Sequence, residues 1–152
     1  MSIALFRLIH ILAVLVWVGG MFFAYVILRK SAAETLQMQS RLRLWSKVLG
    51  LFFNWVWLAV FLLLSSGLYM IYQVGGMAHM PRYMDWMLAL GVVMLLIFAY
   101  VFFACYARYS LLVESKDWVN AEIVLATIRT LIAMDLFIGI LTVAVAVIGR
   151  GM

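Results

Sequence analysis

Residues 86–106 read WMLALGVVMLLIFAYVFFACY, a run in which no side chain carries a charge. A helix that crosses the hydrocarbon core of a bilayer needs roughly 20 mainly apolar residues, so this run is long enough to span a membrane. Three further runs are mainly apolar, and they cover residues 3–28, 48–72 and 130–148. Backbone groups in lipid have no water to bond with, and a helix satisfies them internally. The sequence therefore predicts an all-α polytopic membrane protein, a bundle of four transmembrane helices that forms one domain over residues 1–152.

The composition supports this class and argues against others. Hydrophobic residues make up 69% of the 152 and charged residues 11%, whereas soluble domains are about half apolar and about a quarter charged. The net charge of +5 comes from basic residues that flank the apolar runs, so it indicates membrane topology and not nucleic-acid binding. The one cysteine, Cys105, is predicted to be buried and inert. No phosphate-binding loop, zinc-protease motif, Cys-x-x-Cys or nucleophile elbow is present.

Lysine and arginine residues are distributed unevenly between the two sides of the predicted bundle. Eight belong to the first and third connections between spans: Arg29, Lys30, Arg41, Arg43, Lys47, Arg108, Lys116 and Arg129. Three belong to the other side: Arg7, Arg82 and Arg150. Because cytoplasmic loops carry the excess of basic residues, both termini are predicted to be periplasmic, in a bacterial inner membrane. Trp45 and Trp118 at one interface, and Trp86 at the other, are expected to belong to aromatic belts.

Both histidines fall on the predicted outer side, His10 about two turns into the first helix and His79 in the connection between the second and third spans. Two imidazoles could ligate haem iron axially or bind copper. The same connection carries Met77, Met80 and Met84, and thioether sulfur with imidazole is a ligand set that favours Cu(I). These five residues are the candidate metal ligands, with copper and haem b both left open. The plainer alternative is a solvated loop beside a hydrogen-bonded histidine.

A second candidate set lies along one face of the first helix. His10, Trp17 and Gly20 are spaced i, i+7 and i+10, which places them on the same face. Gly20 would let a neighbouring helix, or the edge of a macrocycle, approach the backbone closely. Tyr69, in a polar cluster near the outer end of the second span, could line the same cavity. These residues and His79 are the candidate cofactor-binding residues, although helix packing alone also explains the glycine.

Asp135 is the other ionisable residue inside a predicted span. An intramembrane carboxylate is costly, so it is expected to face the interior and to be paired or protonated. Arg129 is a poor partner because i,i+6 places the two on different faces of one helix. Arg43 or Lys47 is the predicted partner, in an ion pair that closes the cytoplasmic end. A proton or metal relay is the alternative.

The run from Leu8 to Gly20 resembles the first helix of the copper resistance protein D (CopD) superfamily, where a histidine is followed seven residues later by tryptophan and then by glycine. The resemblance extends through 41–45 and 66–72 and includes the plan of four helices. It implies copper uptake or resistance at an inner membrane, with copper received from a periplasmic carrier. The related HemJ-type protoporphyrinogen oxidases bind haem b through this histidine. In their third helix they carry a lysine, where this chain has Leu90. They also carry a Tyr-His pair there, and this chain has Val101 in place of the histidine.

The sequence thus predicts a CopD-like inner-membrane protein that handles copper at its outer face around His10. A haem b protein for electron transfer or porphyrin oxidation is the alternative from a different class. An accessory subunit that packs in a larger membrane complex is a third. Membrane lipid is the expected surrounding, a homo-oligomer is open, and no enzymatic activity is assigned.

Overall fold

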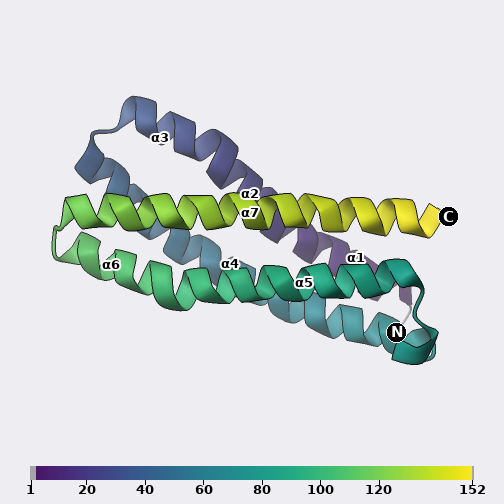
Figure 1. Ribbon diagram of the computed structural model, residues 1–152. Helices are drawn as coiled ribbons and strands as arrows, with labels where there is room; N and C mark the ends of the chain where they lie inside the picture. The colour runs from purple at the N-terminus through teal and green to yellow at the C-terminus, as the bar shows by residue number, and fades with distance from the viewer. Residues whose placement is uncertain (1–2, 152) are drawn as a thin grey trace.

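The computed structural model describes residues 3–151 and consists of four long helices with short connections (Figure 1). The helices are Ile3–Thr35, Met38–Gln73, Arg82–Glu114 and Trp118–Gly151, and each is long and apolar enough to cross a membrane. Each helix contains one of the predicted spans and continues beyond it. The predicted all-α, four-helix membrane protein is therefore confirmed.

The first and third long helices are divided by wider, π-helical turns. The first consists of α1 (Ile3–Val14), η1 (Leu15–Gly19), α2 (Gly20–Phe22), η2 (Phe23–Leu28) and α3 (Arg29–Thr35). The third consists of α5 (Arg82–Tyr100), η4 (Val101–Tyr106) and α6 (Ala107–Glu114). The second and fourth are the unbroken helices α4 (Met38–Gln73) and α7 (Trp118–Gly151). Wider turns of this kind change which side chains face inward, and they are frequent at functional sites.

The four helices form an up-and-down bundle. α1 packs mainly against α4, and α5 mainly against α7. The described chain begins and ends at the same end of the bundle, and the connection from α4 to α5 lies there too (Figure 1). We call this end the terminal end; the two remaining connections lie at the opposite end. The placement of both histidines on one side of the bundle follows from this arrangement, because His79 belongs to that connection and His10 lies near the start of α1.

The connections end the helices by recognisable local chemistry. At the terminal end, Gly75 and Gly76 have φ of 98° and 86°, a region that favours glycine, and a short 3-10 turn, η3 (Met77–His79), follows. Pro81, extended with φ of −62°, precedes the first residue of α5. At the opposite end, Asp117 caps α7 by accepting a hydrogen bond from the Asn120 backbone N–H at 3.3 Å.

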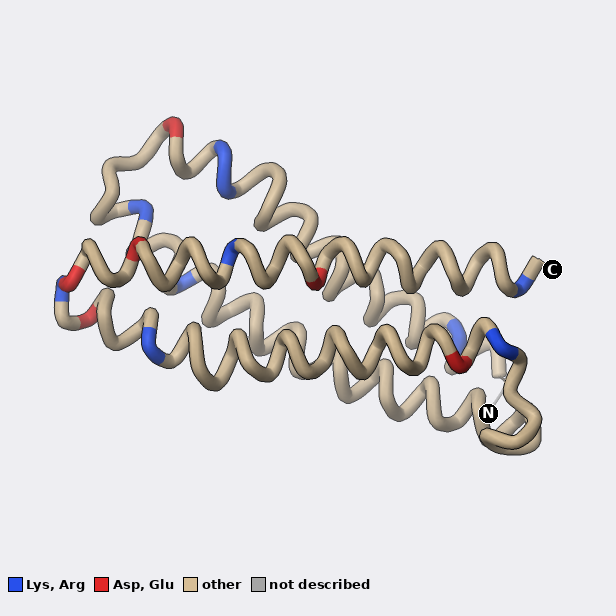
Figure 2. Tube along the Cα trace, in the orientation of Figure 1, with Lys and Arg blue, Asp and Glu red and all other residues tan. Residues whose placement is uncertain are grey.

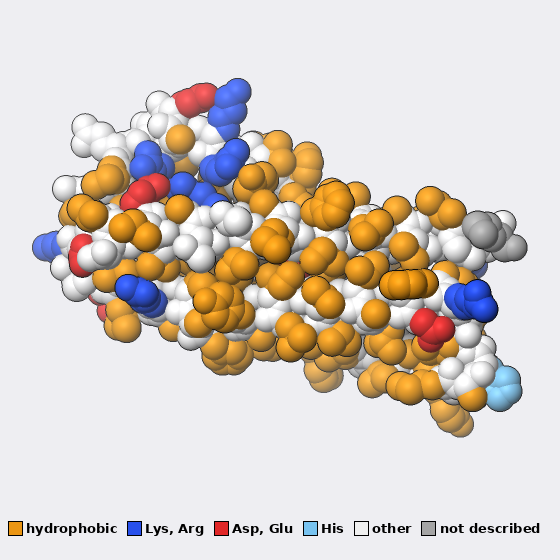
Figure 3. All heavy atoms as spheres, in the orientation of Figure 1, with side chains coloured by type: hydrophobic (Ala, Val, Ile, Leu, Met, Phe, Trp, Pro, Cys, Tyr) orange, Lys and Arg blue, Asp and Glu red, His pale blue; other side chains and the backbone are white. Residues whose placement is uncertain are grey.

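The core runs the length of the bundle as one inward stripe of each helix. On α4, Leu42, Leu49 and Val56 recur every seven residues and are fully buried. Phe53 meets rings of the third helix edge-on, including that of Phe98 at 5.5 Å between centroids. Large hydrophobic side chains also cover the outside of the bundle (Figure 3), which is what contact with lipid requires. Nearly all charged residues gather toward the two ends (Figure 2).

The predicted aromatic belt is wrong at Trp45. This side chain is only 2% exposed, and the Arg129 guanidinium lies 5.8 Å from its ring centroid. Trp45 shares its face of α4 with Leu42 and Leu49, which lie three residues before and four after it and are also buried. Position on the inward stripe therefore outweighs the preference of tryptophan for the interface.

Candidate functional site

His10 lies between α1 and α4, where its Nδ1 is 2.9 Å from the Ser66 hydroxyl oxygen. The Ser66 hydroxyl itself donates to the Leu62 carbonyl of its own helix. With its single hydrogen directed at Leu62, the Ser66 hydroxyl can accept from His10, and the tautomer that matches this arrangement carries the ring proton on Nδ1. Nε2 then keeps its lone pair, which is the form in which an imidazole binds a metal. A partner that fixes the tautomer in this way is typical of metal-binding histidines.

The pairing of these two residues follows from their matching depths in antiparallel helices. His10 lies seven residues after Ile3, where α1 begins, and Ser66 lies seven residues before Gln73, where α4 ends. Gly67 also lies beside the His10 ring, where a β carbon would be 3.5 Å from Cε1, an ordinary van der Waals contact, so the approach does not require glycine. Ser66 is 1% exposed, so its hydrogen bonds are shielded from water. Sequence reasoning did not assign Ser66 to His10, although equal depth at the two helix ends was the signal that could have done so.

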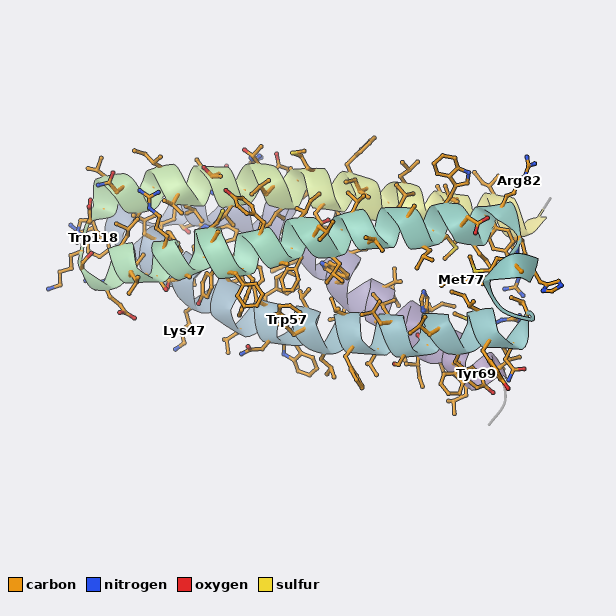
Figure 4. All side chains as sticks on the ribbon, turned by 60° about the horizontal axis from the view of Figure 1, so that its bottom comes forward. Lys47, Trp57, Tyr69, Met77, Arg82 and Trp118 are labelled. Carbon is orange, nitrogen blue, oxygen red and sulfur yellow. The ribbon has the colours of Figure 1, made fainter. Side chains whose placement is uncertain are left out.

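The methionine-rich connection holds the second histidine. The His79 ring folds back on its own loop, with Nδ1 3.1 Å from the Gly75 carbonyl oxygen. His79 and Met77 are exposed, whereas Met80 and Met84 are half-buried. Figure 4 shows Met77 near the terminal end of the bundle, the same end as Arg82 and Tyr69. These side chains are open to ligands from outside the bundle.

The structure does not join the two histidines. His10 is bonded to Ser66 and His79 to Gly75, and nine residues of mainly helical backbone separate those levels by roughly 13 Å. Within residues 3–151, no group of three His, Cys, Asp or Glu side chains is placed to hold a metal ion. Met70, half-buried on α4, lies between the two levels and four residues beyond Ser66, on the same helix face. Its thioether was not singled out from the sequence.

The remaining candidate cofactor-binding residues contact three different aromatic rings and do not meet at one site. Trp17, in η1, is 5% exposed and meets the Phe98 ring at 5.8 Å. Gly20 lies against the Phe52 ring of α4 so closely that a β carbon would collide with it. Tyr69 stacks on Phe6 with centroids 3.8 Å apart. Close helix packing, the plainer of the two explanations considered for Gly20, accounts for its position.

The predicted ion pair of Asp135 with Arg43 or Lys47 is wrong. Asp135 is 3% exposed, and its Oδ1 has no hydrogen-bond partner among residues 3–151. Arg43 lies five residues into α4, about 8 Å along its axis, whereas Asp135 lies 17 residues into α7, about 26 Å along. The two residues are therefore at different depths, because α7 begins well before the apolar run from which depth was estimated.

Asp135 borders a small internal cavity between the helices. The cavity has a volume of about 10 Å³, close to the smallest that holds one water molecule. Its other walls are apolar or aromatic, with the Met21 thioether among them: Trp17, Met21, Phe52, Phe53, Val56, Ile97, Phe98, Val101, Leu131 and Ile132. None of these residues is titratable, so nothing on the cavity wall supplies a counter-charge.

Arginines at the opposite end pair with another acid. Arg41 of α4 and Arg129 of α7 each lie 3.2 Å from a different carboxylate oxygen of Glu122. This ion-pair bridge links α4 to α7 beside the buried Trp45. It provides the ion-paired closure that had been expected of Asp135, with Glu122 as the acid.

The fold and these features define a multi-pass membrane protein with a histidine near one end of the bundle and several methionines in the adjoining connection. A family model described as copper resistance protein D matches residues 46–148, and the chain belongs to that family. The match begins inside α4 and extends through most of α7, so His10, Trp17 and Gly20 of the first long helix lie outside it. No curated protein and no solved structure matches the chain. The chain is accordingly a membrane protein related to copper resistance.

Proposed function

We propose that this protein binds Cu(I) at the terminal end of the bundle, which faces the periplasm, and passes the ion to His10. Family membership indicates a link to copper resistance, and the proposal adds where copper binds and from which side of the membrane it arrives. Copper would be received from a periplasmic carrier, in keeping with the resemblance of the first helix. The protein would act as a permease or a membrane receptor in the inner membrane.

One observation carries the proposal: His10 Nδ1 lies 2.9 Å from the Ser66 hydroxyl, which donates to Leu62, and the tautomer that matches this arrangement leaves Nε2 unprotonated. A histidine that binds a metal needs a fixed tautomer, because the ion needs the lone pair at a defined position. His10 is half-buried, and an ion entering from the terminal end would reach it after passing the level of Met70.

Thioethers supply the route to this imidazole. Met77 is exposed in the connection, and Met70 lies one helical turn from Ser66 on the way inward. Neutral sulfur ligands bind Cu(I) without the desolvation cost that a carboxylate would add, and they survive in an oxidising compartment. An ion handed from sulfur to sulfur and then to Nε2 would not need a preformed group of three charged ligands.

The test is an anaerobic Cu(I) competition titration of the purified protein in detergent. We expect His10→Ala to lower the Cu(I) affinity at least tenfold. Ser66→Ala should lower it less, about threefold to tenfold, because the tautomer is no longer fixed while Nε2 remains. Hydrogen-bond partners that orient a metal-binding histidine typically contribute 10- to 100-fold to metal affinity, and only part of that is expected at a histidine that is half-buried.

Ser65→Ala is the matched control. The Ser65 hydroxyl donates to the Phe61 carbonyl at 2.8 Å and is exposed on the other face of α4, so its loss should leave Cu(I) affinity unchanged. Equal affinities for wild type and His10→Ala would overturn the proposal. Purified protein with a Soret absorption band that disappears in His10→Ala would establish haem b in its place.

A further inference from the structure

A groove opens at the opposite end of the bundle, between α4 and the third helix. It has a volume of about 410 Å³. The residues that line it, which we call the basic groove, are Arg43, Ser46, Lys47, Gly50, Leu51, Tyr106 and Val113. The first five recur at i, i+3, i+4, i+7 and i+8, so they form one continuous face of α4. Figure 4 shows Lys47 extending away from the helices near this end.

Two cations in the basic groove have no acidic partner. Arg41 and Arg129 at this end are engaged with Glu122, but Arg43 and Lys47 have no carboxylate within 4.0 Å among residues 3–151. The Arg43 guanidinium lies 5.3 Å from the Trp118 ring centroid, which restricts where the cation can be. The two charges are one helical turn apart and repel each other. An anion between them would remove that repulsion.

Neutral hydrogen-bonding groups lie beside these cations. The Ser46 hydroxyl makes no hydrogen bond as a donor within residues 3–151, while the Ser46 carbonyl accepts from the Tyr106 hydroxyl at 3.1 Å. Gly50 permits that contact, because a β carbon there would collide with the Tyr106 oxygen. The groove thus presents a free hydroxyl and two basic side chains to one small volume. Oxygen-rich anions such as phosphate are bound by this combination.

The face of α4 below the cations is apolar and uncovered. Leu51 and Trp55 are each 60% exposed, and Leu58 follows one turn deeper at 47%. These residues lie on the same face of α4 as Lys47, and they continue it toward the middle of the apolar run of that helix. A ligand with a phosphate at one end and a hydrocarbon chain at the other matches this order of charge and apolar surface.

We propose that the basic groove binds the headgroup of an anionic phospholipid, with one acyl chain along Leu51, Trp55 and Leu58. The phosphate lies between Arg43 and Lys47 and accepts a hydrogen bond from the Ser46 hydroxyl. Basic pockets between transmembrane helices bind acidic lipids in this manner. The apolar continuation of the groove favours a lipid over a soluble phosphate. This site is separate from His10 and does not depend on the copper proposal.

The test uses the whole protein, reconstituted in vesicles of equal parts phosphatidylglycerol and phosphatidylcholine and then extracted in mild detergent. Lipid retained by the protein is quantified by native mass spectrometry. We expect phosphatidylglycerol to be enriched, and Arg43→Gln/Lys47→Gln to reduce that enrichment more than tenfold, since each basic residue near anionic lipid contributes roughly fivefold. Arg43→Lys/Lys47→Arg keeps both charges and should keep most of the enrichment.

Two arms separate this site from general surface charge and from a phosphate site. Arg29→Gln/Lys30→Gln removes the same charge at the same end but away from the groove, so it should leave the enrichment intact. Inorganic phosphate at matched ionic strength should not displace the lipid, because it lacks the acyl chain. Equal loss in both double-glutamine variants, no loss in either, or full displacement by phosphate would each overturn the proposal.

Discussion

The hydrogen bonds of Ser66 and Asp135 show how differently two buried polar groups can be satisfied in one bundle. The Ser66 hydroxyl contacts His10 Nδ1 and also donates a hydrogen bond to a carbonyl of its own helix. Asp135 has an oxygen that bonds to nothing among residues 3–151. A buried polar atom without a partner costs about 1–3 kcal/mol, and native proteins keep such atoms where function requires them. Substitutions of Asp135 are therefore expected to affect the stability of the protein and its function in different directions.

We expect Asp135→Leu to raise the stability of the purified protein by about 1–3 kcal/mol, because it replaces an unpartnered polar group by one that suits the apolar cavity wall. Asp135→Asn should change stability little, since no basic side chain among residues 3–151 forms an ion pair with Asp135 that the change would break. Thermal or SDS-induced unfolding in detergent measures both. Copper uptake by cells that carry the variants tests whether Asp135 acts as a relay.

Asp117→Ala serves as the reference in the same unfolding assay. It removes the cap of α7 and should cost about 1 kcal/mol, which shows that the assay detects changes of this size. A strongly destabilised Asp135→Asn variant, with Asp117→Ala behaving as expected, would mean that the carboxylate is paired in the membrane after all.

Among the structural elements, the connection from α4 to α5 is the proposed entry point for copper. If Met77, Met80 and Met84 capture Cu(I), replacing them by leucine one after another should lower the affinity in steps. Leucine keeps the apolar volume and removes the sulfur, and such swaps usually cost less than about 1.5 kcal/mol in packing. Anaerobic competition titration of the single, double and triple variants gives the series.

Met134→Leu is the matched control for that series, because Met134 is exposed on α7, on a face turned away from the core. It should not change the affinity. Unchanged affinity in the triple loop variant would exclude the loop as a copper ligand. His10 would then be left to bind the ion without help from the connection.

The sequence predicts helices far better than it predicts partners. Number, type and order of the helices follow from apolar length alone, since a bilayer allows few other structures. The depths of single residues were less accessible, because α4 and α7 extend as polar helix beyond their apolar runs and move every depth estimate with them. That shift explains the wrong partner for Asp135. Trp45 was misassigned because residue type was weighed above its place on the stripe of Leu42 and Leu49.

The candidate site was predictable in part. His10 is one of only two histidines, and three of the eleven methionines fall within residues 77–84, so both were singled out from the sequence. The Ser66 contact depends on the register of two antiparallel helices, which hydropathy does not specify. The three contacts made by Trp17, Gly20 and Tyr69 depend on the same helix register. They also depend on the wide turn η1, which no residue type predicts.

For the molecule as a whole, the two proposed sites lie at opposite ends of one bundle. The copper site is at the terminal end, and the basic groove is at the end that carries most lysines and arginines (Figure 2). Anionic lipid is abundant at the cytoplasmic leaflet, and basic residues are retained on that side. Charge distribution and lipid binding thus favour the same orientation, which also turns the methionine-rich connection toward the oxidising compartment.

That orientation predicts a specific pattern of reporter activity. Alkaline phosphatase folds only outside the cytoplasm, so a fusion after Met152 should be active in a bacterial host, while a fluorescent protein at the same point should be dark. A fusion after Lys116, in the connection at the opposite end, should give the reverse and is the internal control. The eight basic residues at that end against three at the other are the physical reason, because they resist translocation. Active phosphatase after Lys116 and inactive phosphatase after Met152 would place His10 and the methionines in the cytoplasm. Copper capture from a periplasmic carrier would then be impossible, whatever the affinity of the site.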